Sequence, residues 1–166
     1  MIMVENYVNV KEKARKLNLN IPSQIALLPL NFKTATAKEE LLHASTTPTV
    51  RKLWAQNNVQ ETPIEKAGEK IPYSAGEAFE WISPIIFVSS LLLSKNPHLI
   101  NIALNVISNY LTDWFRGIPY NERKVKLSIV VETRSGEYKE VKYEGPPDGL
   151  DKLPEILKEI HNEKRS

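Results

Sequence analysis

The chain has 166 residues, the size of one ordinary domain, and its 42% hydrophobic and 25% charged residues are typical of a folded globular protein. A formal net charge of +2, without a one-sided basic region, argues against a nucleic-acid-binding protein, and the absence of cysteine excludes disulfides and thiolate chemistry. Charged residues interrupt the start of the chain where a signal peptide needs an apolar core, so we expect a cytoplasmic protein.

The N-terminal residues predict a surface helix followed by a short strand. Apolar residues recur at helical spacing from Val4 to Leu17, with lysine and arginine on the other faces, which predicts a helix over residues 3–17. Residues 24–28 form an apolar run between two prolines that is too short for a helix. We interpret this run as a strand.

Two short helices and a loop come next. Residues 37–44 predict one short helix, and Thr47 followed by Pro48 predicts the start of another that ends near Gln56. Residues 60–74 are rich in Glu, Lys, Pro and Gly and have no periodicity. We expect a surface loop or hinge there.

The middle of the chain is apolar and almost free of charge. Between residues 81 and 115 only Lys95 and Asp113 are charged. Pro97 cannot continue a helix that began before it, but it is well suited to start one. Residues 75–116 therefore predict a buried apolar helical hairpin, with one helix on each side of this proline.

Residues 123–162 predict a ββα unit. The first strand alternates apolar and polar residues, broken only by Val130. A three-residue loop ending at Gly136 would place Ile129 opposite Val141 and keep the apolar side chains on one face. An amphipathic helix closes the unit.

Together these elements predict a single α+β domain, residues 1–166, that is mainly helical. Its parts are N-terminal helices, a buried apolar helical hairpin, a β-hairpin and a C-terminal helix. A two-stranded hairpin is marginally stable alone, so it must pack on the helices and pair along an edge. Residues 24–28 are the internal candidate for that pairing, and the alternative is an exposed edge that invites another chain.

The patterns that could indicate metal or nucleic-acid binding are incomplete. Glu40 and His43 have the Glu-x-x-His spacing of di-iron bundles, but the second pair and further carboxylates are missing, so we expect a solvated helix face. Residues 11–30 loosely match a helix-turn-helix whose recognition helix would carry no basic residue. We assign no metal, cofactor-binding or catalytic residue.

A short acidic-x-lysine element occurs twice in the predicted β-hairpin. Glu137-x-Lys139 and Glu140-x-Lys142 match the element with which many nucleases hold magnesium, and Glu132 is the nearest second carboxylate. A pattern of three residues is common by chance in a charged segment. A small metal-dependent nuclease is therefore the least favoured of our hypotheses.

The charge-poor segment and the absence of a reactive cluster favour a non-enzymatic interaction or regulatory protein. It would be an accessory subunit or self-associating protein that uses an apolar helix face or a free strand edge, with another protein or a second copy as partner. The alternative is a membrane-associating protein that uses residues 81–115 peripherally, since the uncharged stretches are short for a span. The candidate interaction residues are Trp81, Phe87, Asn101, Asn105, Tyr110, Trp114 and Phe115.

Overall fold

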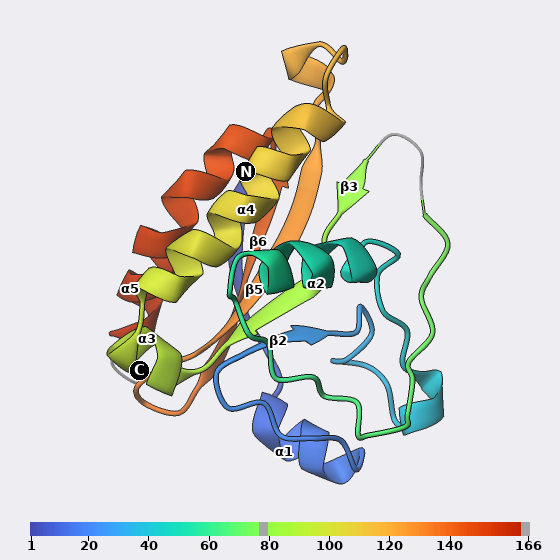
Figure 1. Ribbon diagram of the computed structural model, residues 1–166. Coiled ribbons are helices and arrows are strands. Elements are labelled where there is room, and N and C mark those ends of the chain that lie inside the picture. Colours follow the sequence, from blue (N-terminus) through green and yellow to red (C-terminus); the bar gives the residue numbers. More distant parts are fainter. Residues whose placement is uncertain (77–79, 164–166) are drawn as a thin grey trace.

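The centre of the protein is a six-stranded mixed sheet with helices packed on it (Figure 1). The computed structural model describes residues 1–76 and 80–163. The strand order is β1-β6-β5-β4-β2, and β3 also pairs with β5. The strands are β1 (Ile2–Asn6), β2 (Ile25–Leu28), β3 (Trp81–Ile82), β4 (Ile85–Val88), β5 (Val125–Glu132) and β6 (Tyr138–Gly145).

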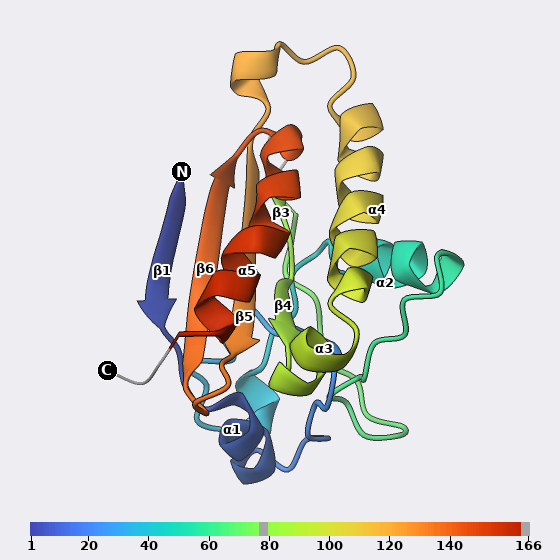
Figure 2. The same cartoon turned by 90° about the vertical axis from the view of Figure 1, so that its left-hand side faces the viewer.

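The helices are short except for α4, which lies along the sheet beside α5 (Figure 2). The α-helices are α1 (Val10–Lys16), α2 (Thr47–Gln56), α3 (Ser90–Lys95), α4 (His98–Trp114) and α5 (Leu153–His161). The 3-10 helices are η1 (Lys38–Glu40), η2 (Tyr120–Glu122) and η3 (Pro147–Lys152). The predicted α+β class is confirmed, but the prediction of a mainly helical domain is wrong because the sheet forms its centre.

The β5–β6 hairpin has the predicted register. Ile129 lies opposite Val141. The backbone N–H of Thr133 donates to the carbonyl of Glu137 at 2.8 Å, which closes a three-residue loop. Gly136 in that loop has a φ of 86°, a left-handed conformation that a residue without a Cβ adopts at little cost.

The predicted helical hairpin over residues 75–116 is wrong in its first half. Residues 77–79 lie outside the described part of the chain, and residues 85–88 form β4 between β2 and β5. All four residues of β4 are buried, so the strand is uniformly apolar rather than alternating. Such a run cannot be distinguished from a buried helix by periodicity. After Pro97 the prediction is right, because α4 begins at the next residue.

A bulge separates β3 from β4. Ile82 lies opposite Lys126, whereas Ile86, four residues later, lies opposite Ile129, only three residues further along β5. One extra residue is therefore accommodated around Pro84. Proline has no N–H to contribute to a ladder, and a bulge is one of the positions in a sheet that tolerate it.

The predicted helix over residues 3–17 is also wrong in its first half. Its first residues form β1, and α1 begins only at Val10, where the side chain of Asn9 accepts a hydrogen bond from the N–H of Glu12 at 3.0 Å. This cap fixes where the helix starts. The helix predicted over residues 37–44 is reduced to the single turn of η1.

The apolar run at residues 24–28 is a strand, β2, but it pairs with β4 and not with the hairpin. The outer side of β2 is covered by the irregular segment that follows α2, where the N–H of Thr62 donates to the carbonyl of Ile25 at 2.8 Å. Ile64 and Ile71 in the predicted surface loop are buried. The loop therefore contributes to the core.

The face of the sheet that carries α4 and α5, here called the first face, is covered along most of its length. Leu127, Ile129 and Val131 of β5 share one apolar cluster with Ile107 and Leu111 of α4. Side chains of α5 complete this layer. The alternation in β5 is the pattern of a strand with this one face buried.

The opposite, second face carries a layer that includes α1, and this second layer covers only part of the sheet. Phe87 and Val130 belong to a separate apolar cluster with Val10 and Ala14 of α1. Val130 breaks the alternation of β5 because it lies under this second layer, whereas Ser128, two residues earlier on the same face, is half-buried. On the remaining part of this face a groove lies beside Met3, Ser128 and Lys142.

Replacement of Phe87 by alanine tests the buried position of β4. Phe87 is fully buried and stacks on Tyr138 with 6.3 Å between ring centroids. Because a large cavity would remain, we expect Phe87→Ala to lower the free energy of unfolding by about 3–5 kcal/mol in urea denaturation. The control Leu91→Ala removes a side chain that is 49% exposed and should change it by no more than about 0.5 kcal/mol. Equal losses for the two variants would contradict the placement of β4.

Candidate functional site

Three of the five aromatic residues predicted to mediate interaction belong to the core. Trp81, Phe87 and Phe115 are buried, so they are not available to a partner in this fold. Trp114 and Tyr110 are half-buried and contact the ring of Trp81, with centroids 5.6 and 5.5 Å apart. Four of these aromatic residues therefore form a cluster between α4 and the sheet.

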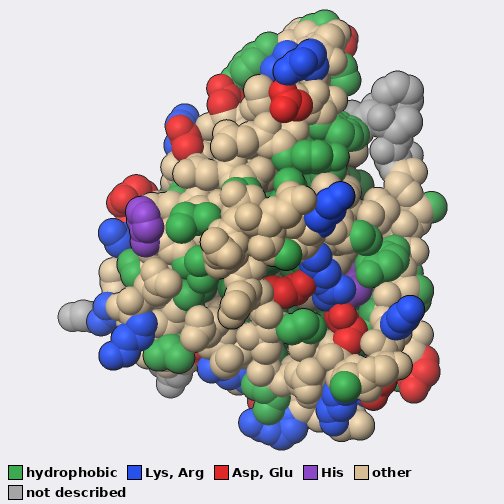
Figure 3. Space-filling model, in the orientation of Figure 1, with side chains coloured by type: hydrophobic (Ala, Val, Ile, Leu, Met, Phe, Trp, Pro, Cys, Tyr) green, Lys and Arg blue, Asp and Glu red, His purple; other side chains and the backbone are tan. Residues whose placement is uncertain are grey.

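The two predicted asparagines lie apart from that cluster. Asn105 is exposed and Asn101 is half-buried on α4. Figure 3 shows the side of the molecule with α2 and α4, where apolar side chains form patches separated by polar and charged ones. The structure therefore brings together four of the five predicted aromatic residues, while Phe87 lies in the cluster on the opposite face of the sheet.

Four consecutive residues in β1 and directly before it are exposed and apolar. Met1, Ile2, Met3 and Val4 are 73, 37, 43 and 51% exposed. Ile2 and Val4 are on the sheet face that carries α5, and Met1 and Met3 are on the opposite face, because side chains alternate along a strand. Neither the layer of α4 and α5 nor the layer that includes α1 covers these side chains.

The outer edge of β1 carries unused hydrogen-bonding groups. Met1 exchanges both backbone bonds with Glu144, at 2.7 and 2.9 Å, and the N–H of Tyr7 donates to Tyr138. In an antiparallel ladder such bonded pairs alternate with unbonded ones. The N–H and C=O groups of residues 2, 4 and 6 therefore point away from β6, and no described strand pairs there.

Most of the devices that protect an edge are missing from β1, and its one charged side chain, Glu5, is paired with Lys142 of the neighbouring strand. Its sequence, IMVEN, has no proline or lysine, and its register with β6 is continuous from Ile2 to Asn6 without a bulge. The opposite edge of the sheet, β2, is fully buried and covered by the chain around Thr62. Of the two edges of the sheet, β1 and β2, only β1 is therefore open.

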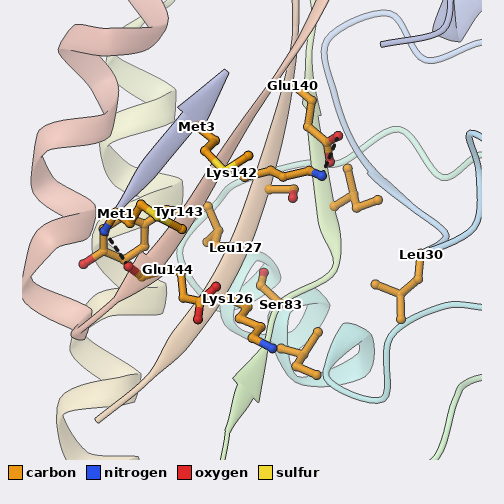
Figure 4. A pocket seen from close by; sticks show the side chains of 13 residues that line it. Met1, Met3, Leu30, Ser83, Lys126, Leu127, Glu140, Lys142, Tyr143 and Glu144 are labelled. Carbon is orange, nitrogen blue, oxygen red and sulfur yellow. Dashed lines mark hydrogen bonds and ion pairs between the residues drawn. The ribbon is translucent and has the colours of Figure 1, made fainter. Parts of the chain in front are cut away.

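A groove of about 300 Å³ lies beside β1 on the part of the sheet that the second layer leaves open. It runs from Met1 and Met3 across β6 and β5 to Leu30 (Figure 4). Lys126 and Lys142 also line it, and both are paired with carboxylates: Lys126 Nζ lies 3.2 Å from Glu80, and Lys142 Nζ lies 3.1 Å from Glu5. The groove is therefore lined by both apolar and polar residues, and each of its two lysines is balanced by a carboxylate.

Charged residues converge at a second place, beside α2. The imidazole Nε2 of the buried His43 lies 2.9 Å from Glu65 Oε1, and Arg51 contacts Glu65 at 2.9 Å and Glu61 at 2.6 Å. The ring of Tyr73 stacks on His43. This network joins α2 to the chain that covers β2, so its role in the fold is structural.

The pKa values of the two glutamates in this network differ in direction. Burial acts to raise the pKa of Glu65, but the hydrogen bond from His43 and the charge of Arg51 outweigh it and lower the pKa below 4.5. Burial dominates at Glu61 and raises its pKa, although Arg51 opposes the change. The ionised Glu65 is therefore the carboxylate that stabilises the network most.

The residues of the metal and nuclease patterns do not converge. Glu40 bonds to Thr36 rather than acting with His43. Glu132 accepts hydrogen bonds from the N–H of Ser90 and the hydroxyl of Tyr138, both at 2.9 Å. Among residues 1–76 and 80–163 no three His, Asp or Glu side chains are arranged to hold a metal ion.

The described helices include none that is long and apolar enough to cross a membrane. Comparisons of the chain with models of protein families, with curated proteins and with solved structures gave no match.

Replacement of Glu65 by glutamine tests the network beside α2. Because the folded pKa is lower than the unfolded value of 4.5, ionised Glu65 stabilises the fold above that pH, and the stabilisation is lost as the pH falls through the folded pKa. We expect Glu65→Gln to cost about 1–3 kcal/mol at neutral pH in urea denaturation. The cost should shrink below pH 4.5. The control Glu39→Gln changes an exposed carboxylate, and a loss equal to that of Glu65→Gln would contradict the role of the network.

Proposed function

We propose that the protein is a non-enzymatic interaction module that binds an extended segment of a partner as an additional strand on β1. The observation that supports this most directly is the outward direction of the backbone groups of Ile2, Val4 and Asn6 on an unpaired edge. Addition of a strand satisfies such groups with main-chain hydrogen bonds.

The side chains of β1 suggest which segments it would accept. A strand beside β1 would place alternate residues against Ile2 and Val4 on one face and against Met1 and Met3 on the other. These four positions are apolar, so a partner segment with apolar residues on both faces would bury the most surface. Methionine side chains adapt to different neighbours, which suits an interface that accepts several sequences.

The edge is already in the conformation that binding requires. β1 is held in register by β6, and the salt bridge between Glu5 and Lys142 links their side chains at 3.1 Å. Only the partner segment would need to become ordered, which reduces the entropic cost of association.

Substitutions at Val4 test this function. Val4→Lys places a charge on the edge, a natural means of preventing strand addition, whereas Val4→Thr keeps a β-branched side chain of similar size. Peptides selected for binding from a displayed random library should bind the Val4→Thr variant like the parent protein. We expect their dissociation constants to rise at least about tenfold with Val4→Lys, a loss of about 1.4 kcal/mol.

Two results would contradict the proposal. One is that the selected peptides bind the Val4→Lys variant as tightly as the parent protein, since their site would then lie elsewhere. The other is that Val4→Thr weakens binding as much as Val4→Lys, because β1 would then respond to any change and not to a blocked edge. Urea denaturation of both variants checks that they remain folded.

A further inference from the structure

We infer that the extended segment that β1 accepts is β1 of a second copy of this chain, paired antiparallel about Met3 so that the two sheets become one. This inference rests on the proposed function of the β1 edge and names its partner. Self-pairing about a two-fold axis requires that the same strand supply complementary positions on both sides.

Three symmetric registers use the outward backbone groups near the middle of β1, and the one centred on Glu5 is disfavoured because it sets the two Glu5 carboxylates opposite each other. Two registers remain. In the first, centred on Met3, Ile2 bonds with Val4 of the second copy and the two Met3 side chains face each other. In the second, centred on Val4, Ile2 lies opposite Asn6, and Met3 lies opposite Glu5. The outward groups of residues 2, 4 and 6 are compatible with both registers.

The register centred on Met3 is favoured by its side-chain pairs. It sets Ile2 against Val4 on the face that carries α5 and Met3 against Met3 on the other face, so apolar residues meet on both. Glu5 lies opposite Met1, and like charges do not meet. The register centred on Val4 also sets Glu5 against a methionine, but it places the polar Asn6 against Ile2 and leaves only Val4 opposite Val4 as an apolar pair.

The surroundings of β1 leave room for a second copy. In Figure 2, β1 is the outer border of the sheet and lies outside α5. The exposure of Ile2 and Val4 shows that α5 does not cover the edge on its side, and the exposure of Met1 and Met3 shows the same for the α1 layer. In the two-fold dimer the grooves of both copies would lie on the same face, side by side across the paired Met3 residues.

The size of this interface predicts weak association. One short strand pair and four exposed side chains would bury on the order of several hundred Å² per copy, at the low end for specific interfaces. The dimer should therefore form reversibly as concentration rises, rather than being permanent.

Sedimentation velocity from low micromolar to millimolar concentration tests the dimer. The parent protein and the Val4→Thr variant should pass from monomer to dimer, while Val4→Lys should remain monomeric. A parent protein that stays monomeric throughout would overturn the inference, as would a Val4→Lys variant that dimerises like the parent. If the monomeric parent still binds selected peptides in a manner sensitive to Val4→Lys, self-pairing is wrong and the proposed function stands.

Single cysteine variants test the register, since the chain has no cysteine of its own. Residues facing each other in an unbonded antiparallel pair have Cα atoms about 4.5 Å apart, within the range of a disulfide. Met3→Cys should therefore form a disulfide-linked dimer on mild oxidation, and the control Glu5→Cys, on the same face, should form much less. Equal cross-linking of the two variants, or none with Met3→Cys, would overturn the register.

Discussion

The pairing of β4 with β5 holds the two parts of the sheet together. On one side of it lie β2 and the irregular chain beside α2, and on the other lies the antiparallel group of β5, β6 and β1. Glu132 at the end of β5 strengthens this connection, because its carboxylate accepts the N–H of Ser90 at the start of α3 and contacts Lys11 of α1 at 3.1 Å. One side chain thus links the sheet to helices on both of its faces.

Unequal coverage of the sheet follows from this arrangement and determines where another molecule can bind. The β4 side is enclosed by two layers, so Phe87 is fully buried. Towards β1 the layers end, and the sheet terminates in a strand with free backbone groups and exposed apolar side chains, such as Val4. Function is therefore proposed at the border of the sheet, away from its best-packed region.

Local patterns predicted the elements that depend on local rules. The alternation of β5, the left-handed glycine at Gly136 and the proline before α4 each indicate one structure without reference to distant residues. The sequence predicts a helix at β4 because burial on both faces removes the alternation of a strand. It also predicts a helix at the short β1. A free strand edge is one of the predicted kinds of interaction site, but the position of such an edge depends on the order of strands from distant parts of the chain. Of the predicted aromatic residues, Trp81, Phe87 and Phe115 are buried, which the sequence does not indicate because an apolar run does not reveal what covers it.

Residue-resolved amide hydrogen exchange in dilute solution distinguishes an open β1 edge from a covered one, because it reports which backbone groups of β1 are bonded. The account predicts alternation: the N–H groups of Met3 and Glu5, which face β6, exchange slowly, while those of Ile2, Val4 and Asn6 exchange quickly. Uniform protection of these five N–H groups would contradict an open β1 edge, since it would indicate a covered edge or a helix. Fast exchange at all five would also contradict it, since β1 would then not be paired with β6.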